Sequence, residues 1–99
     1  MNPEDVVGGI GAEKPADAEV QDVCKKVKPQ FIKQSGKNAD TFQLLSYKTQ
    51  VVSGKNYFVK VDIGDDFCHL KISAPHSGKD PELLGWQCGK TKNDAITSF

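Results

Sequence analysis

The spacing of apolar side chains changes once along the chain, and the first spacing predicts a helix. Between about residues 15 and 35, apolar side chains recur at steps of three and four, which is the period of one helical face. They are Val20, Val23, Cys24, Val27 and Phe31. Pro15 suits the first helical position, where the missing N–H costs nothing, and Gly36 follows at the expected end. Residues 1–14 are rich in glycine and acidic side chains and form an N-terminal arm before the helix.

From about residue 42 to residue 90 the period is two, which predicts strands with one buried face each. The residues that share the predicted buried face in the four runs are Leu45, Tyr47, Thr49 and Val51; Tyr57, Val59, Val61 and Ile63; Cys68, Leu70 and Ile72; and Leu84, Trp86 and Cys88. Trp86 lies on the apolar face of its run and is therefore expected in the core. One helix followed by an antiparallel meander predicts an α+β domain, with the helix covering one face of the sheet.

The register of the first predicted hairpin follows from its apolar residues. If the loop is residues 52–54, Thr49 faces Tyr57, Tyr47 faces Val59, and Leu45 faces Val61, so that every apolar residue lies on one face. Gly54 then takes the left-handed position of a three-residue turn. Val52 is left exposed at the tip. An exposed valine is common on protein surfaces, but it also suits a rigid apolar tip that enters a groove of another protein.

Composition limits the class of partner and predicts the compartment. The 99 residues suit one domain spanning 1–99. Thirteen basic and thirteen acidic residues balance, so we expect neither a nucleic acid nor an anionic membrane as partner. The start of the chain lacks the basic and apolar segments of a secretory signal. The three cysteines, Cys24, Cys68 and Cys88, are an odd number, which favours reduced thiols in the cytoplasm.

Enzyme, cofactor and metal motifs are not found. The neighbours Cys68 and His69 point to opposite faces of a strand, which prevents a nucleophile–base pair. His76 is expected in a solvated loop. No CxxC pair or nucleotide-binding fingerprint is present. The sequence therefore predicts a non-catalytic protein without cofactor or metal.

Several segments resemble the stefins, the cytoplasmic type 1 branch of the cystatin family of cysteine protease inhibitors. Residues 50–54 read QVVSG and fit the family's QxVxG hairpin. The flanking segments 47–52 and 56–61 are similar to stefin strands. Further similarity lies at residues 14–16, 27–30 and 69–71, and at the terminal Phe99.

The resemblance implies an antiparallel sheet of about five strands wrapped around one long helix, with the N-terminal arm as a possible edge strand. It implies tight, reversible inhibition of papain-like cysteine proteases such as cathepsins. Three segments are expected to form one wedge that enters the protease cleft. Their residues are Val6, Val7, Gly8 and Gly9 in the arm, Gln50, Val51, Val52, Ser53 and Gly54 in the hairpin, and Pro75 and His76 in a second loop.

Two properties of the chain stay open from its sequence. From composition alone, Gly8 and Gly9 fit either a flexible arm or a close backbone approach to a partner. We expect a monomer, but opening of the loop at Ser53 is a route to a strand-exchanged dimer. A non-inhibitory interaction protein that self-associates in this way is the alternative function.

Overall fold

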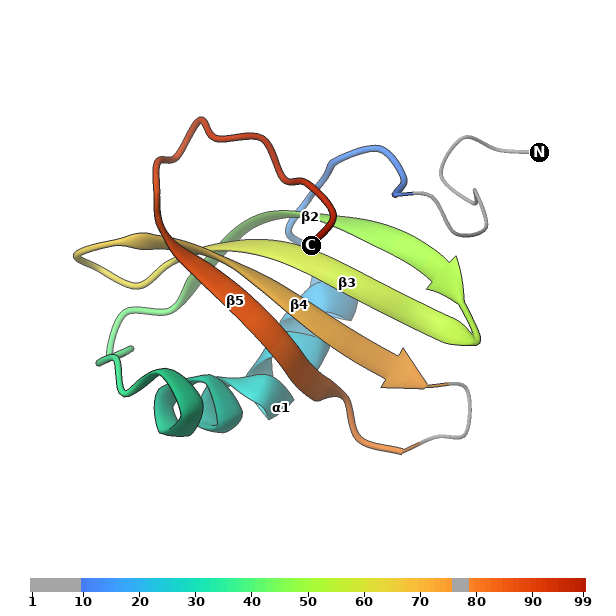
Figure 1. The fold of residues 1–99 in the computed structure, drawn as a ribbon, viewed down its shortest axis with the longest axis horizontal. Helices are drawn as coiled ribbons and strands as arrows, with labels where there is room; N and C mark the ends of the chain where they lie inside the picture. The colour runs from blue at the N-terminus through green and yellow to red at the C-terminus, as the bar shows by residue number, and fades with distance from the viewer. Residues whose placement is uncertain (1–9, 76–78) are drawn as a thin grey trace.

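The computed structural model describes residues 10–75 and 79–99 and contains one helix packed against a five-stranded antiparallel sheet. The elements are β1 (Lys14–Pro15), α1 (Ala18–Ser35), β2 (Gln43–Val52), β3 (Gly54–Asp62), β4 (Phe67–Pro75) and β5 (Glu82–Lys90). The strands follow one another in the sheet in the order β1-β2-β3-β4-β5, and α1 crosses one face of it (Figure 1). The predicted α+β fold is confirmed. The predictions for Val6, Val7, Gly8, Gly9 and His76 fall outside the described residues.

Helix α1 begins later than the sequence suggests. The carboxylate of Asp17 caps it by accepting a hydrogen bond from the backbone N–H of Val20 at 3.1 Å. The prediction that Pro15 is the first helical residue is wrong, because Pro15 lies in β1 opposite Ser46. An edge position suits proline, which has no N–H to donate to a sheet. The helix ends as expected, with Gly36 in the left-handed conformation at φ 71° and its N–H bonded to the carbonyl of Ile32.

The first hairpin has the predicted register near its tip and departs from it further away. Tyr47 pairs with Val59 and Thr49 with Tyr57, as predicted. The expected pairing of Leu45 with Val61 is wrong, because the register shifts between Leu44 and Ser46 and Leu44 pairs with Val61 instead. Such a bulge places two residues of one strand opposite one residue of its partner, which side-chain alternation alone does not reveal.

The main core fills the space between α1 and the sheet. The ring of Phe31 on α1 lies 6.2 Å from that of Trp86 on β5 in an edge-to-face arrangement, so Trp86 packs against the core as predicted, although it is only partly buried. Leu84 is not on this face. A register shift in the β4–β5 ladder buries Leu83 and leaves Leu84 49% exposed.

A second buried layer covers the opposite face of the sheet, and the sequence pattern did not predict it. Phe58 on β3, His69 on β4 and Ile96 near the C-terminus are almost completely buried. The segment 91–99 crosses this face (Figure 1), and the ring of Phe99 lies 5.8 Å from that of Phe58. The sheet therefore has apolar contacts on both faces.

Two lysine side chains attach this C-terminal segment to the sheet. The ammonium of Lys48 donates to the carbonyl of Ile96, and that of Lys60 donates to the carbonyl of Lys92, each at 2.9 Å. Lys60 is almost fully buried, so its hydrogen bond offsets part of the cost of removing the charge from water. Polar residues that alternation assigns to a solvated face thus serve as anchors.

The prediction of three reduced thiols is wrong for two of the cysteines. Cys68 on β4 and Cys88 on β5 form a disulfide, with their Cα atoms 4.1 Å apart. The two strands are neighbours, and the register shift between Phe67 and His69 brings Cys68 beside Cys88. Cys24 is a free, buried thiol whose pKa is raised to about 12 by burial, so it stays protonated and is a poor nucleophile.

Candidate functional site

Three segments that are distant in sequence meet at one end of the sheet. Gly54, the first residue of β3, pairs with Val52 on one side and with Pro75, the last residue of β4, on the other. Ile10 in the arm makes an antiparallel bridge to Gln50. We call Ile10, residues 50–54 and Pro75 the tip edge, which lies where the arrowheads of β2 and β4 point in Figure 1.

The hairpin tip presents an apolar side chain on a tight turn. Val52 is 42% exposed and Ser53 is exposed between the paired residues Val52 and Gly54. Gly54 has φ 117°, a backbone conformation that other residues rarely adopt. The predicted three-residue loop with glycine at positive φ is confirmed, and it fixes the direction in which Val52 projects.

Side-chain contacts link the two strands of this hairpin to each other and to the helix. The amide of Asn56 donates to the side-chain oxygen of Gln50 across the strands at 3.0 Å. The hydroxyl of Tyr57 donates to the Glu19 carboxylate of α1 at 2.6 Å. Burial, followed by this hydrogen bond to a carboxylate, raises the pKa of Tyr57, so the hydroxyl keeps its proton and remains the donor. The ammonium of Lys55 lies 3.5 Å from the same carboxylate.

The described part of the arm runs along β2 towards the tip. The N–H of Gly11 donates to the carbonyl of Thr49 at 2.8 Å, and Lys14 pairs with Tyr47 in the short strand β1. The expected edge strand from the arm is therefore present. Ile10, the first described residue, lies opposite Gln50, so the described part of the arm begins beside the hairpin tip.

His69 lies in the second buried layer, in surroundings that do not suit a catalytic base. Its side chain is on the opposite face from Cys68, as predicted, and the sulfur of Cys68 is part of the disulfide. Neither ring nitrogen has a hydrogen-bond partner within the described part of the chain. Burial, then the charges of Lys90 and Lys60, lower the pKa of His69, while Asp94 and Glu13 act weakly in the other direction. The ring is therefore neutral and structural.

Membrane insertion through a helix finds no support in the described residues. Neither the length nor the apolar character of a helix there is sufficient to cross a bilayer. The predicted cytoplasmic location stays a prediction, and the disulfide is a feature more common in oxidising compartments.

Comparison with known proteins decides the family. The family model described as "Cystatin domain" matches residues 8–93. The chain belongs to the cystatin family. The matched range includes the hairpin and both strands beside it, and it begins at Gly8 in the arm.

Relatives of this cystatin match over nearly its whole length. Cystatin-A of Mus musculus is 42% identical over 96 residues, covering 95% of this chain and 99% of the relative. Cystatin-B of Bos taurus is 41% identical over 95 residues, covering 93% and 97%. Leukocyte cysteine proteinase inhibitor 1 of Sus scrofa is 37% identical over 99 residues, covering 97% and 96%. The similarity to stefins inferred from the sequence is confirmed, and the relatives are named as inhibitors and cystatins, not as enzymes, which supports the expectation that this cystatin is not an enzyme.

Proposed function

We propose that this cystatin is a reversible, tight-binding inhibitor of papain-like cysteine proteases of the cathepsin class. The observation that carries the proposal is the convergence of arm, hairpin and β4 end at the tip edge. A relative with 37% identity is named for the inhibition of cysteine proteinases. The expected contact residues are Val6, Val7, Gly8 and Gly9, Gln50, Val51, Val52, Ser53 and Gly54, and Pro75 and His76.

The tip edge suits insertion into a long, narrow active-site cleft. Val52 and Ser53 are exposed at the turn of the hairpin, and Pro75 is held beside Gly54 in the next strand pairing. The arm lies on the other side of the hairpin, beginning at the Ile10 bridge. The order arm, hairpin, second loop would therefore extend along the cleft, with the hairpin in the middle beside the catalytic cysteine of the protease.

Inhibition by this wedge requires no chemistry from the inhibitor. A wedge that fills the cleft without placing a peptide bond in line with the attacking thiolate blocks the enzyme and is not cleaved. The hairpin is already fixed by the Gln50–Asn56 and Tyr57–Glu19 hydrogen bonds. It therefore loses little conformational entropy on docking, which favours tight binding.

Titration of papain, with its active sites counted beforehand, tests the proposal. We expect residual activity to fall to near zero at one equivalent of the protein. Val52→Asp should raise the inhibition constant at least about tenfold, because it removes roughly 1.5 kcal/mol of apolar contact and adds a charge that must lose water. Gly8→Trp should weaken inhibition by crowding the close approach of the arm.

Ile32→Asp is the matched control. Ile32 is also an exposed apolar residue, 39% accessible, and it lies near the C-terminal end of α1, which Figure 1 shows at the end of the molecule opposite the hairpin. Inhibition that survives both Val52→Asp and Gly8→Trp would refute the wedge. Full papain activity at a large excess of protein would instead favour the interaction protein that self-associates by strand exchange, which size-exclusion chromatography would show as a dimer.

A further inference from the structure

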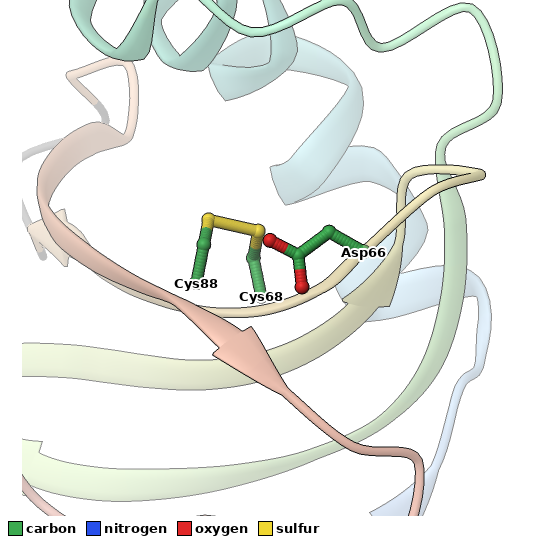
Figure 2. A group of neighbouring side chains, drawn as sticks. All are labelled: Asp66, Cys68 and Cys88. Carbon is green, nitrogen blue, oxygen red and sulfur yellow. A yellow bond between two sulfur atoms is a disulfide. The ribbon is translucent and has the colours of Figure 1, made fainter.

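A group of potential metal ligands lies at the other end of the sheet from the tip edge. The carboxylate of Asp66 and the sulfur atoms of Cys68 and Cys88 all lie within 4.8 Å of one another. Figure 2 shows the Asp66 side chain directed at the two sulfur atoms. Sulfur and carboxylate oxygen are both ligands of Zn²⁺ in proteins.

Backbone hydrogen bonds hold the Asp66 carboxylate in this direction. It accepts a hydrogen bond from the N–H of Gly89, the residue after Cys88, at 3.0 Å, and one from the N–H of Phe67 at 2.7 Å. Hydrogen bonds of this kind orient a ligand before the metal arrives. Gly89 has φ 74°, so the chain turns sharply there and its N–H points at the carboxylate. Asp66 thus contacts both strands that carry the cysteines.

The position of the group permits access from solvent on one side. Cys68 is fully buried, but Cys88 and Asp66 are only partly buried. The ammonium of Lys37 lies 3.9 Å from the Asp66 carboxylate. Two thiolates and one carboxylate carry three negative charges, so a bound Zn²⁺ leaves one, and Lys37 is placed to balance it.

We propose that reduction of the Cys68–Cys88 disulfide converts this group into a Zn²⁺ site. In the first step a dithiol reductant transfers two electrons to the disulfide, becomes a cyclic disulfide itself, and leaves two cysteine thiols. In the second step the thiols release two protons and bind one Zn²⁺ as thiolates, with Asp66 as third ligand and a water molecule in the fourth position. The proposal departs from the prediction of a chain without metal, which rested on the absence of a CxxC pair.

The required movements are small. Two sulfur atoms on a tetrahedral zinc lie roughly 3.8 Å apart, given a Zn–S distance of about 2.3 Å. Once the covalent bond is broken, rotation of the partly buried Cys88 side chain can provide this separation while β4 and β5 stay paired. The backbone next to Cys88 stays beside Asp66 during this rotation, because the N–H of Gly89 donates to both oxygens of that carboxylate at 3.0 Å.

The test compares the oxidised and reduced forms of the same full-length chain. The protein is reduced with a phosphine, and binding is followed with Co²⁺, whose thiolate charge-transfer absorption reports sulfur ligands directly. Zn²⁺ affinity is then measured by displacement of the cobalt. We expect one equivalent of metal in the reduced form and none in the oxidised form, and Cys88→Ser should abolish the charge-transfer band of a two-thiolate site.

Two variants distinguish the proposed ligands from the third thiol of the chain. Asp66→Asn should weaken Zn²⁺ binding by about tenfold or more, while Cys24→Ser, which removes the buried third thiol, should leave it unchanged. Equal metal binding by oxidised and reduced protein would overturn the proposal, and so would binding that depends on Cys24. Circular dichroism of each variant establishes that it is folded, so that loss of binding is not loss of structure.

Discussion

The second buried layer leads to a stability prediction for a residue far from the tip edge. Ile96 is 1% exposed beneath the C-terminal segment. Ile96→Ala removes three carbon atoms, worth about 0.8 kcal/mol each in lost burial, or about 2.4 kcal/mol before any cavity cost. Substitutions of this type cost about 2–5 kcal/mol. Since a terminal segment can partly relax into the space, we expect Ile96→Ala to lower the free energy of unfolding by about 2–3 kcal/mol.

Urea unfolding followed by tryptophan fluorescence measures this loss. With a slope near 1 kcal/mol per molar urea for a small protein, the midpoint should fall by roughly 2–3 M at unchanged slope. The backbone carbonyl that accepts from Lys48 is retained in the variant, so the experiment isolates the packing of the side chain. Inhibition of papain by the folded variant should be unchanged, because Ile96 lies outside the tip edge.

Leu84→Ala provides the control for this experiment. Leu84 has the same number of carbon atoms as isoleucine but is 49% exposed on β5, and exposed substitutions usually change stability by no more than about 0.5 kcal/mol. If Ile96→Ala proves as mild as Leu84→Ala, the segment 91–99 does not pack on the sheet in solution, and the second buried layer does not contribute to stability.

Two more predictions concern charge and backbone conformation. The pKa of His69 in the folded state lies below its ordinary 6.5, so the unfolded chain binds a proton at a higher pH than the folded chain does. The contribution of His69 to the free energy of unfolding should therefore be fully present above about pH 6.5 and be lost as the pH falls below it. When the urea midpoint is measured from pH 7.5 to 5, His69→Leu should make it depend less steeply on pH. An unaltered pH dependence in this variant would contradict a buried neutral ring. Gly36→Ala should cost roughly 1–2 kcal/mol in the same unfolding assay, since its β-carbon meets no atom within 4 Å and only the φ of 71° is unfavourable. Gly36→Asn should cost less, because asparagine tolerates this conformation.

Periodic segments were predictable from the sequence because their buried faces repeat. The helical face through Phe31 and the pairing of Thr49 with Tyr57 both follow from spacing alone. So does the exposed tip at Val52, because the only register that buries every alternate apolar residue leaves it outside. The role of the tip did not follow from spacing and needed the resemblance to a family.

Features that depend on long-range register were not predictable in this way. A bulge shifts which leucine of β5 is buried, so Leu83 replaces Leu84 in the core. The pairing of Cys68 with Cys88 depends on a similar shift between neighbouring strands. The C-terminal segment has no period, and its contacts with Phe58 and Lys60 form only once the sheet exists. Local patterning does not encode any of these three.

The position of β3 in the sheet has a consequence for how the molecule opens. β3 is paired along its length with β2 on one side and β4 on the other, whereas the described part of the arm, from Ile10 onwards, is attached to β2 by the two residues of β1, the Ile10 bridge and a few backbone hydrogen bonds. Detaching the arm therefore breaks few hydrogen bonds, while exposing the amides of β3 requires the sheet to come apart. Amide hydrogen exchange should accordingly have two levels, rapid through local fraying of the arm and slow, at the cost of global unfolding, in β3. The hairpin should thus keep its structure while the arm is detached from β2.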